Sequence, residues 1–380
     1  MKVAVLGAGG LVGGTLVRRL IRDGRAEVRA CVRNPANAWS LIGLGVPLTT
    51  SDLRDRSSIS GAIDGCTHVV NCALGDDRHL RECMENLVLS CKTSGIRRLV
   101  HLSSVAVYGE PPPPESAEES AVPQARRGTY GWQKLQQDEV AFRAHRSGLS
   151  TAVLCLPHVT GPGSRFLLSL IRELGSGQFA FIDGGRHPVV MADVENVAEA
   201  ICAAMVAPGV DGRRMFINDG PAQPWSSLVA ALAPMAGIDA AGIPRLTTET
   251  VRGHHEHRLS PIAAIRQMTS IPEVRRILSK TSLGSDAWLI RMIKRAAKRR
   301  IAPTTMLRPG PASTLQVPPS GLWSQQLRMV DHSNARARSV LGFQPPHTFE
   351  ASMSAFERWY SRMHLYGSSH WDMACRIRGG

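Results

Sequence analysis

Short apolar runs alternate with amphipathic stretches through the first half of the chain. Residues 3–6 form a fully apolar run, residues 11–22 follow with helical spacing, and residues 27–32 are again strand-like. The alternation continues with apolar runs at 67–73, 99–102 and 151–156 and helical patterns at 81–94 and 132–145. Strands buried on both faces and separated by helices are typical of a parallel sheet with helices on either side. The sequence therefore predicts an α/β fold with a Rossmann-like, doubly wound parallel sheet.

The alternation loosens beyond residue 163. Helical patterns cover 165–174, 194–205 and 348–363, a strand is expected at 215–217, and residues 244–319 are irregular and rich in proline. We predict a Rossmann domain over residues 1–163, with contributions to its sheet up to about residue 220. Residues 164–366 would form a smaller C-terminal substrate-binding region that includes the basic insertion 244–319, and residues 367–380 a tail.

Composition narrows the class of protein. Of the 380 residues, 43% are hydrophobic and 20% are charged, as in a soluble globular protein. No apolar run approaches the 18 or so residues of a membrane span, and Met1-Lys2 leads directly into the first strand, so we expect neither a transmembrane helix nor a signal peptide. The eight cysteines are scattered without metal-binding spacing, which favours a reducing, cytoplasmic location and no metal site.

The positive charge is concentrated in one segment. The formal charge is +14, and 14 lysines and arginines against four acids between Arg245 and Arg308 supply +10 of it. A helical pattern at 286–300 has Trp288 and Leu289 on one face and basic residues opposite. We interpret the insertion as a cap over an anionic substrate, with peripheral contact to an acidic membrane as the less favoured alternative. Aromatic residues do not interleave with the basic ones, so no nucleic-acid partner is expected.

A glycine turn follows the first apolar run. Gly7, Gly10 and Gly13 are spaced GxxGxxG, and Leu11 and Val12 open the helix behind the turn. Backbone N–H groups at such a helix N-terminus bind a pyrophosphate, and the helix dipole assists them. We predict that this turn binds a dinucleotide.

The end of the second strand bears on the choice of cofactor. An acidic residue there would bind the ribose hydroxyls of NAD, whereas an arginine accommodates the 2′-phosphate of NADP. This strand ends in Cys31-Val32-Arg33-Asn34 without an acid. The residues favour NADP(H), with Arg33 on the phosphate, and leave NAD(H) as the alternative. Asp52, followed by Leu53, could accept a hydrogen bond from the adenine amino group.

Tyr130 and Lys134 are four residues apart and therefore share a helix face. A phenol has an unperturbed pKa near ~10, and a neighbouring ammonium group lowers it toward the range that acid–base catalysis requires. Ser104 ends a strand, where its hydroxyl could hydrogen-bond the reacting oxygen. We predict a proton-transfer site made of Ser104, Tyr130 and Lys134.

These motifs together resemble the extended short-chain dehydrogenases/reductases, the family of UDP-galactose epimerase. The resemblance covers about residues 1–218 and 331–360, and its matching stretches are Gly7 to Gly13, Asp52-Leu53, Asn86, Arg98 to Gly109, Tyr130 to Lys134, Pro157 to Gly163, Asp193 and Leu341 to Pro345. It implies that Ser104, Tyr130 and Lys134 are the catalytic triad and that Lys134 also binds the nicotinamide ribose. It further implies a homodimer and roles for the following residues: Leu53 and Ala73 in cofactor binding, Asn86 in the active-site water network, Pro157 to Val159 along the nicotinamide, and Arg186 on a substrate diphosphate.

The resemblance implies reversible hydride transfer at a secondary alcohol or ketone carbon of a small molecule. The substrate could be a nucleotide-linked sugar, on which the chain would act as a reductase or an epimerase. Leu156 stands where nucleotide-sugar enzymes often carry asparagine, so a hydrophobic ketone of steroid, flavonoid or specialised-metabolite type is the alternative. A non-catalytic NADP-sensing protein is a third alternative, but such proteins typically lose the tyrosine or the lysine.

Overall fold

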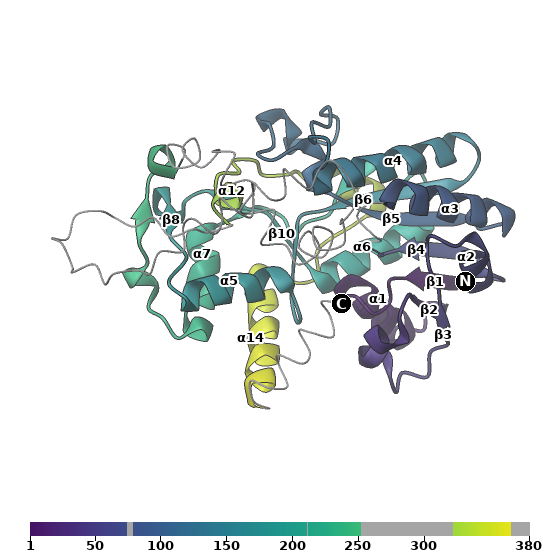
Figure 1. Cartoon of the computed structure of the whole chain (residues 1–380), viewed down its shortest axis with the longest axis horizontal. Coiled ribbons are helices and arrows are strands. Elements are labelled where there is room, and N and C mark those ends of the chain that lie inside the picture. The colour runs from purple at the N-terminus through teal and green to yellow at the C-terminus, as the bar shows by residue number, and fades with distance from the viewer. Residues whose placement is uncertain (74–78, 211, 252–321, 366–380) are drawn as a thin grey trace, which may run out of the picture. The chain divides into compact units, whose positions relative to one another are not determined.

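Seven parallel strands form the centre of the protein. The computed structural model describes residues 1–73, 79–210, 212–251 and 322–365 (Figure 1). The sheet has the order β3-β2-β1-β4-β5-β6-β11, and its strands are β1 (Lys2–Leu6), β2 (Glu27–Val32), β3 (Leu48–Thr50), β4 (His68–Asn71), β5 (Arg98–Ser104), β6 (Ser150–Leu156) and β11 (Arg214–Phe216). The order reverses between β1 and β4, as in a doubly wound fold. The predicted fold class is confirmed.

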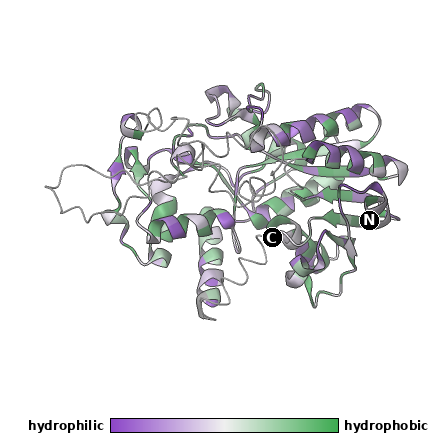
Figure 2. Ribbon diagram, viewed as in Figure 1, coloured by the Kyte–Doolittle hydropathy of each residue, from purple (hydrophilic) through white to green (hydrophobic). Residues whose placement is uncertain are grey.

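Helices cover both faces of this sheet. One face packs against α1 (Leu11–Arg22), α6 (Val194–Val206) and α13 (Ala335–Leu341), and the other against α2 (Arg56–Ile63), α3 (Leu80–Thr93) and α4 (Tyr130–Arg146). The strands alternate between the two layers: Val3 and Val5 face the first, Ala4 and Leu6 the second. Figure 2 shows the resulting hydrophobic strands between helices whose polar residues lie outward. Burial on both faces is the physical reason that these strands read as continuous apolar runs.

The C-terminal part of the chain, from β7 onward, is built around its own apolar cluster. Trp225 is fully buried there among residues of α5 and α14. The elements of this region are β7 (His158–Thr160), α5 (Arg165–Gly175), β8 (Phe181–Ile182), β9 (Pro188–Val189), β10 (Met191–Asp193), β12 (Gln223–Pro224), α7 (Trp225–Leu232), β13 (Arg245–Leu246), α12 (Trp323–Gln326) and α14 (Phe349–Leu365). Strand β10 pairs with β7 in parallel, and β12 pairs with β9 antiparallel. Short 3₁₀ helices connect the elements of the whole chain: η1 (Pro35–Leu41), η2 (Val105–Tyr108), η3 (Pro114–Ala117), η4 (Asp183–Gly185), η5 (Pro234–Ala236) and η6 (Ala240–Gly242).

The contacts divide the chain into two compact units. One comprises Met1–Arg245 with Ser320–Gly380, and the other Leu246–Pro319. The contacts do not separate residues 1–163 from 164–245, and the predicted domain boundary there stays a prediction. The helix expected at 286–300 and the tail 367–380 lie outside the described residues. Within the described ranges, no helix has the length and apolar character needed to cross a membrane.

The beginning of α4 explains how Tyr130 reaches its position. The helix starts at Tyr130 because the Thr129 hydroxyl accepts a hydrogen bond from Trp132 N (3.2 Å) and so caps the first turn. Gly131 then lets the helix lie directly on η2, since a Cβ on this residue would meet Ala106 O and lie 2.7 Å from Ala106 C. Both features hold the first turn of α4 against the end of β5.

Replacing Gly131 with alanine should push α4 away from η2. We expect Gly131→Ala to lower the free energy of unfolding by about 1–3 kcal/mol, as overpacking does elsewhere, in urea titrations followed by circular dichroism. Gly61→Ala is the matched control, because Gly61 lies in α2 with nothing within 4 Å of its added Cβ. It should stabilise the protein by about 0.5–1 kcal/mol. Equal effects of the two substitutions would contradict the close approach of α4 to η2.

Candidate active site

The predicted glycine turn brings the backbone of β1 against that of β4. Gly7 has a φ of +78°, and a Cβ there would lie 2.8 Å from Ala73 N. A Cβ on Gly13 would meet Gly7 O. Only glycine fits at both positions, so the turn stays tight and its backbone stays open to a ligand. The N-terminus of α1 follows, and Gly10 caps it without a side-chain hydrogen bond, which leaves the first helical amides to bind an anion.

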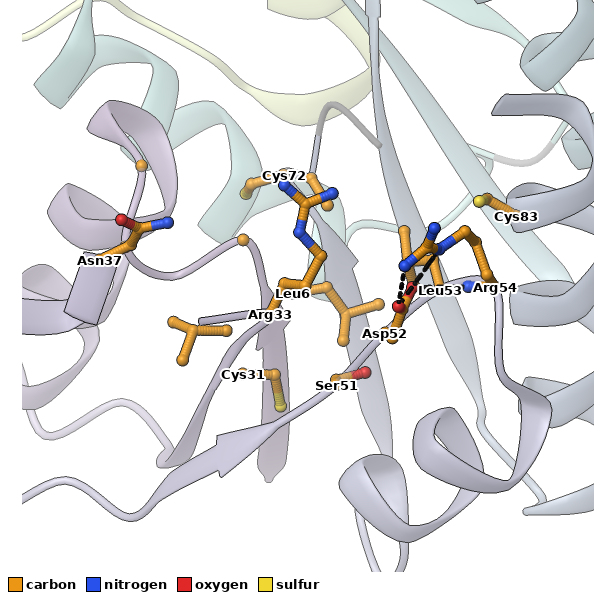
Figure 3. A pocket seen from close by; sticks show the side chains of 15 residues that line it. Leu6, Cys31, Arg33, Asn37, Ser51, Asp52, Leu53, Arg54, Cys72 and Cys83 are labelled. Atoms are coloured by element: carbon orange, nitrogen blue, oxygen red, sulfur yellow. Dashed lines mark hydrogen bonds and ion pairs between the residues drawn. The ribbon is translucent and has the colours of Figure 1, made fainter. Parts of the chain in front are cut away.

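A cavity of about 240 Å³ opens at this turn. Its lining comes from the carboxyl ends of β1, β2 and β4 and the loop after β3, and includes Leu6, Gly7, Gly10, Cys31, Arg33, Asn37, Asp52, Leu53, Cys72 and Ala73 (Figure 3). The cavity lies where the strand order reverses, the usual place for a nucleotide in such a sheet. Turn, helix N-terminus and cavity fit the adenosine and pyrophosphate of a dinucleotide.

The charged residues of this cavity differ in how they are paired. Arg33 is exposed and extends between Asn37 on one side and the Asp52–Arg54 pair on the other (Figure 3). Arg54 Nη2 donates to Asp52 Oδ2 (2.7 Å). The hydrogen bonds from the Arg54 side chain and backbone lower the pKa of Asp52. Asp52 is therefore an ionised acceptor on the adenosine side. Its predicted contact with an adenine amino group stays a prediction.

Asn86 on α3 contacts the loop after β3. Its Nδ2 donates to Leu53 O (3.3 Å) and to Arg54 O (3.4 Å). These bonds hold the loop that carries Asp52, and the role of Asn86 in an active-site water network stays a prediction. The sequence pattern could not show this, because the loop and α3 meet only in the tertiary structure.

The three triad residues come from two neighbouring elements. Tyr130 is the first residue of α4 and is 45% exposed, whereas Lys134, one turn later, is 3% exposed. Ser104 ends β5, and its Oγ accepts a hydrogen bond from Ala106 N (3.2 Å). This bond uses a lone pair of the hydroxyl, so its proton can be donated to a substrate oxygen. Helix α4 packs on both β5 and η2, which places the predicted residues on the same edge of the sheet.

Lys134 holds its charge in a buried environment. Its Nζ donates to Leu102 O (3.1 Å). Burial lowers the pKa of Lys134 to about 8, although the nearby carboxylate of Asp138 opposes this change. The side chain is therefore still mostly charged at neutral pH, and small changes in its surroundings alter its charge.

Asp138 is a residue of this site that the sequence analysis missed. It is fully buried four residues after Lys134, and its Oδ2 accepts from Ser103 Oγ (2.9 Å) and Arg214 Nε (2.7 Å). Burial raises the pKa of Asp138, and Arg214 counteracts this. Nε2 of His101 lies 3.7 Å from Oδ1 of the same carboxylate. Burial keeps the pKa of His101 well below its usual range. The spacing Tyr130, Lys134, Asp138 on one helix face was the signal that could have found it.

The structure places the remaining predicted site residues, Pro157, Val159 and Arg186, in three different environments. Pro157 lines a second, small cavity beside Val105. Val159 packs against the core, and its carbonyl accepts from Ser164 Oγ (2.6 Å). The Arg186 side chain is 77% exposed and lies 3.9 Å from Asp183, so its predicted contact with a diphosphate stays a prediction. Among the described residues, no group of three or more His, Cys, Asp or Glu side chains could hold a metal ion.

Known proteins share this arrangement. The model of the NAD dependent epimerase/dehydratase family matches residues 3–217. The 4-hydroxy-2-methyl-3-oxo-4-farnesyl-3,4-dihydroquinoline-1-oxide ketoreductase of Stigmatella aurantiaca is 27% identical over 63% of this chain and 75% of its own length. The dTDP-6-deoxy-L-talose 4-dehydrogenase (NAD(P)(+)) of Kitasatospora kifunensis is 35% identical over 65% of this chain and 81% of its own.

Solved structures agree on the fold. The UDP-glucuronic acid 4-epimerase of Bacillus cereus in complex with NAD superposes with a TM-score of 0.66 at 13% identity, over 96% of this chain and 100% of that one. The family model spans more than half of the chain and begins at the strand that carries the glycine turn. This protein belongs to the NAD dependent epimerase/dehydratase family and is an NAD(P)-dependent enzyme.

Proposed function

We propose that this protein is an NADP(H)-dependent ketoreductase that interconverts a ketone and a secondary alcohol on a hydrophobic small molecule. The observation that carries the proposal is the placement of Ser104 at the end of β5 and of Tyr130 and Lys134 on α4, which packs on that strand. Val105, the residue after Ser104, lines a small cavity together with Pro157. Leu156, in place of a polar residue, precedes the turn that lines this cavity. The ketoreductase of Stigmatella aurantiaca supports the same reaction.

When bound, the nicotinamide cofactor supplies or accepts the hydride. The substrate carbonyl oxygen would accept a hydrogen bond from Ser104 Oγ, whose own lone pair is bound by Ala106 N (3.2 Å). Tyr130 would donate its phenolic proton to the oxygen as negative charge develops there, and would take it back in the reverse direction. The exposed first turn of α4 lets this tyrosine reach both substrate and water.

Lys134 contributes through its charge. An ammonium one helical turn from Tyr130 stabilises the phenolate that remains after proton transfer. The carboxylate of Asp138 favours the charged lysine, and the carbonyl of Leu102 orients its Nζ (3.1 Å). The same ammonium can donate to the ribose of the cofactor, so Lys134 links cofactor binding to proton transfer.

A nucleotide-linked sugar is the second candidate substrate. It is favoured by the dTDP-sugar dehydrogenase of Kitasatospora kifunensis and by Arg186, which is exposed on the substrate side. Thermal-shift assays with UDP-, GDP- and dTDP-sugars against uncharged ketones separate the two candidates. A rise in melting temperature with a nucleotide sugar but with no ketone would replace the proposal with this second function.

Tyr130→Phe should abolish ketone reduction and spare cofactor binding. Only the transferable proton is removed, so we expect kcat to fall by about 10²–10⁴-fold while the Kd for NADPH changes by less than about twofold. The fall is measured by NADPH absorbance and the Kd by fluorescence titration. Tyr360→Phe, in α14 against Phe356, is the control and should retain activity. Loss of NADPH binding in Tyr130→Phe would indicate a structural tyrosine instead.

The lowered pKa of Lys134 predicts the alkaline limb of the pH profile. Because this pKa is about 8 in the protein, the ammonium is present below pH 8 and is lost as the pH rises through that value. We expect kcat/KM for ketone reduction to fall above about pH 8, since kcat/KM reports groups of the free enzyme. Lys134→Arg keeps its charge and should move this fall upward. A wild-type profile that stays flat to pH 10 would contradict the role of the ammonium.

Arg33 should give the enzyme its preference for NADP(H). Removing a guanidinium that binds the 2′-phosphate should weaken NADP(H) binding by about 10–100-fold, as for a hydrogen bond to a charged group, and leave NAD(H) binding unchanged. Titration of both cofactors into wild type and Arg33→Ala measures this. Arg54→Ala is the matched control, since Arg54 lines the same cavity but pairs with Asp52. Equal affinities of wild type for the two cofactors would refute the preference.

A further inference from the structure

Three residues that line one small cavity each carry a buried polar atom without a partner. In the described part of the chain, Trp225 Nε1, Gln325 Oε1 and Arg328 Nε are buried and make no hydrogen bond. All three residues line the same cavity of about 20 Å³, together with Val105, Pro157 and His158. Buried polar groups are normally satisfied, so several unsatisfied ones at one place indicate a missing ligand or water. The space as it stands holds about one water molecule.

The cavity adjoins the reacting position. Ser104 on β5 pairs in register with Leu156 on β6. The next residues, Val105 and Pro157, therefore leave the sheet side by side, and both line the cavity. A substrate with its carbonyl oxygen on Ser104 would place a group attached close to that carbon toward this cavity.

Arg328 is the charged member among the described residues that line the cavity. Its side chain is 19% exposed, and its Nη2 lies 2.6 Å from Oε1 of Glu110, whose side chain is 54% exposed. The rings of His158 and Phe166 are stacked, with their centroids 4.1 Å apart. Burial and the charge of Arg328 lower the pKa of His158 to about 3. His158 is therefore neutral, and the guanidinium provides the positive charge at this end of the cavity.

We propose that Arg328, with the indole N–H of Trp225, forms a subsite for a substrate carboxylate close to the reacting carbon, and that Glu110 occupies Arg328 until the substrate arrives. This deepens the proposed ketoreductase function, on which it rests, by naming the substrate class: hydrophobic 3-hydroxy or 3-oxo carboxylic acids. A guanidinium binds a carboxylate through two parallel hydrogen bonds, and Arg328 has Nε unpaired beside the Nη2 that Glu110 uses. Glu110 is exposed in the loop after η2, so it can leave without burying a charge.

The experiment compares an acid with its neutral counterpart on the full-length protein. Oxidation of 3-hydroxyoctanoate and of 2-octanol is followed by NADPH formation, and binding of 3-hydroxyoctanoate at saturating NADP⁺ by calorimetry. Arg328→Met should lower kcat/KM for 3-hydroxyoctanoate by about 10–100-fold and change that for 2-octanol by less than about twofold. Glu110→Gln should raise kcat/KM for the acid alone, because it removes the competing carboxylate. Arg22→Met is the control, since Arg22 is an exposed arginine paired with Asp23 at the far end of α1.

The outcomes separate the subsite from the reaction. Turnover of both alcohols without preference for the acid in wild type, or equal loss on both in Arg328→Met, would overturn the subsite and leave the ketoreductase standing. Binding of 3-hydroxyoctanoate to wild type but not to Arg328→Met, without turnover, would support the subsite and refute the reductase. Failure of wild type to bind 3-hydroxyoctanoate would overturn the subsite. If Arg328→Met weakens binding of dTDP-glucose but not of the acid, Arg328 binds a diphosphate and the proposal is wrong.

Discussion

The burial of one charged side chain, Lys134, constrains much of the active site. An ammonium removed from water is strongly destabilising unless it is paired and hydrogen-bonded. Here Leu102 O accepts from Nζ and the Asp138 carboxylate lies one turn along the same helix. Asp138 is held in turn by Ser103 and Arg214. These bonds join α4 to β5 and β11, so the position of Tyr130 depends on a polar set that must form as a whole.

The glycine turn and the end of β5 lie at the same edge of the sheet. In a parallel sheet all carboxyl ends lie on one side, so the glycine turn after β1, Ser104 after β5 and Pro157 after β6 share that edge. Two glycines allow the backbone segments at this edge to pack closely. Gly7 lets the end of β1 approach Ala73, and Gly131 lets α4 approach Ala106. The cavity at the glycine turn and the positions of Ser104 and Tyr130 therefore follow from the same topology.

The position of Arg328 depends on contacts between segments that lie far apart in the sequence. Asn218 Nδ2 donates to His332 O (2.6 Å), and Asn334 Nδ2 donates to Asn218 O (3.2 Å). These bonds hold the segment after α12 against the end of β11. As a result Arg328 meets Glu110, which lies 218 residues earlier. The loop after η2 thus holds one partner of an ion pair, and in our proposal a substrate carboxylate replaces Glu110 on Arg328.

The sequence by itself determined the sheet and the glycine turn, and it placed Ser104 at a strand end and Tyr130 and Lys134 on one helix face. These features rest on local rules: apolar runs buried on both faces, glycine where only glycine fits, and spacing along one helix. The observed α1 and β2 have the boundaries that the periodicity predicted. Asp138 was within reach of the same spacing argument, because it lies on the face of α4 that carries Lys134.

Only the tertiary structure decided which residues surround those three residues. The Asn86 amide holds the backbone of Leu53 and Arg54, a contact between α3 and the loop after β3 that no local pattern marks. Arg328 carries no local pattern that marks it, and its pairing with Glu110 and its place beside Trp225 arise where remote segments pack together. Periodicity reports how one element faces its neighbours, whereas contacts between distant segments depend on the whole fold. The glycine turn could therefore be read from the sequence, and the cavity beside Arg328 could not.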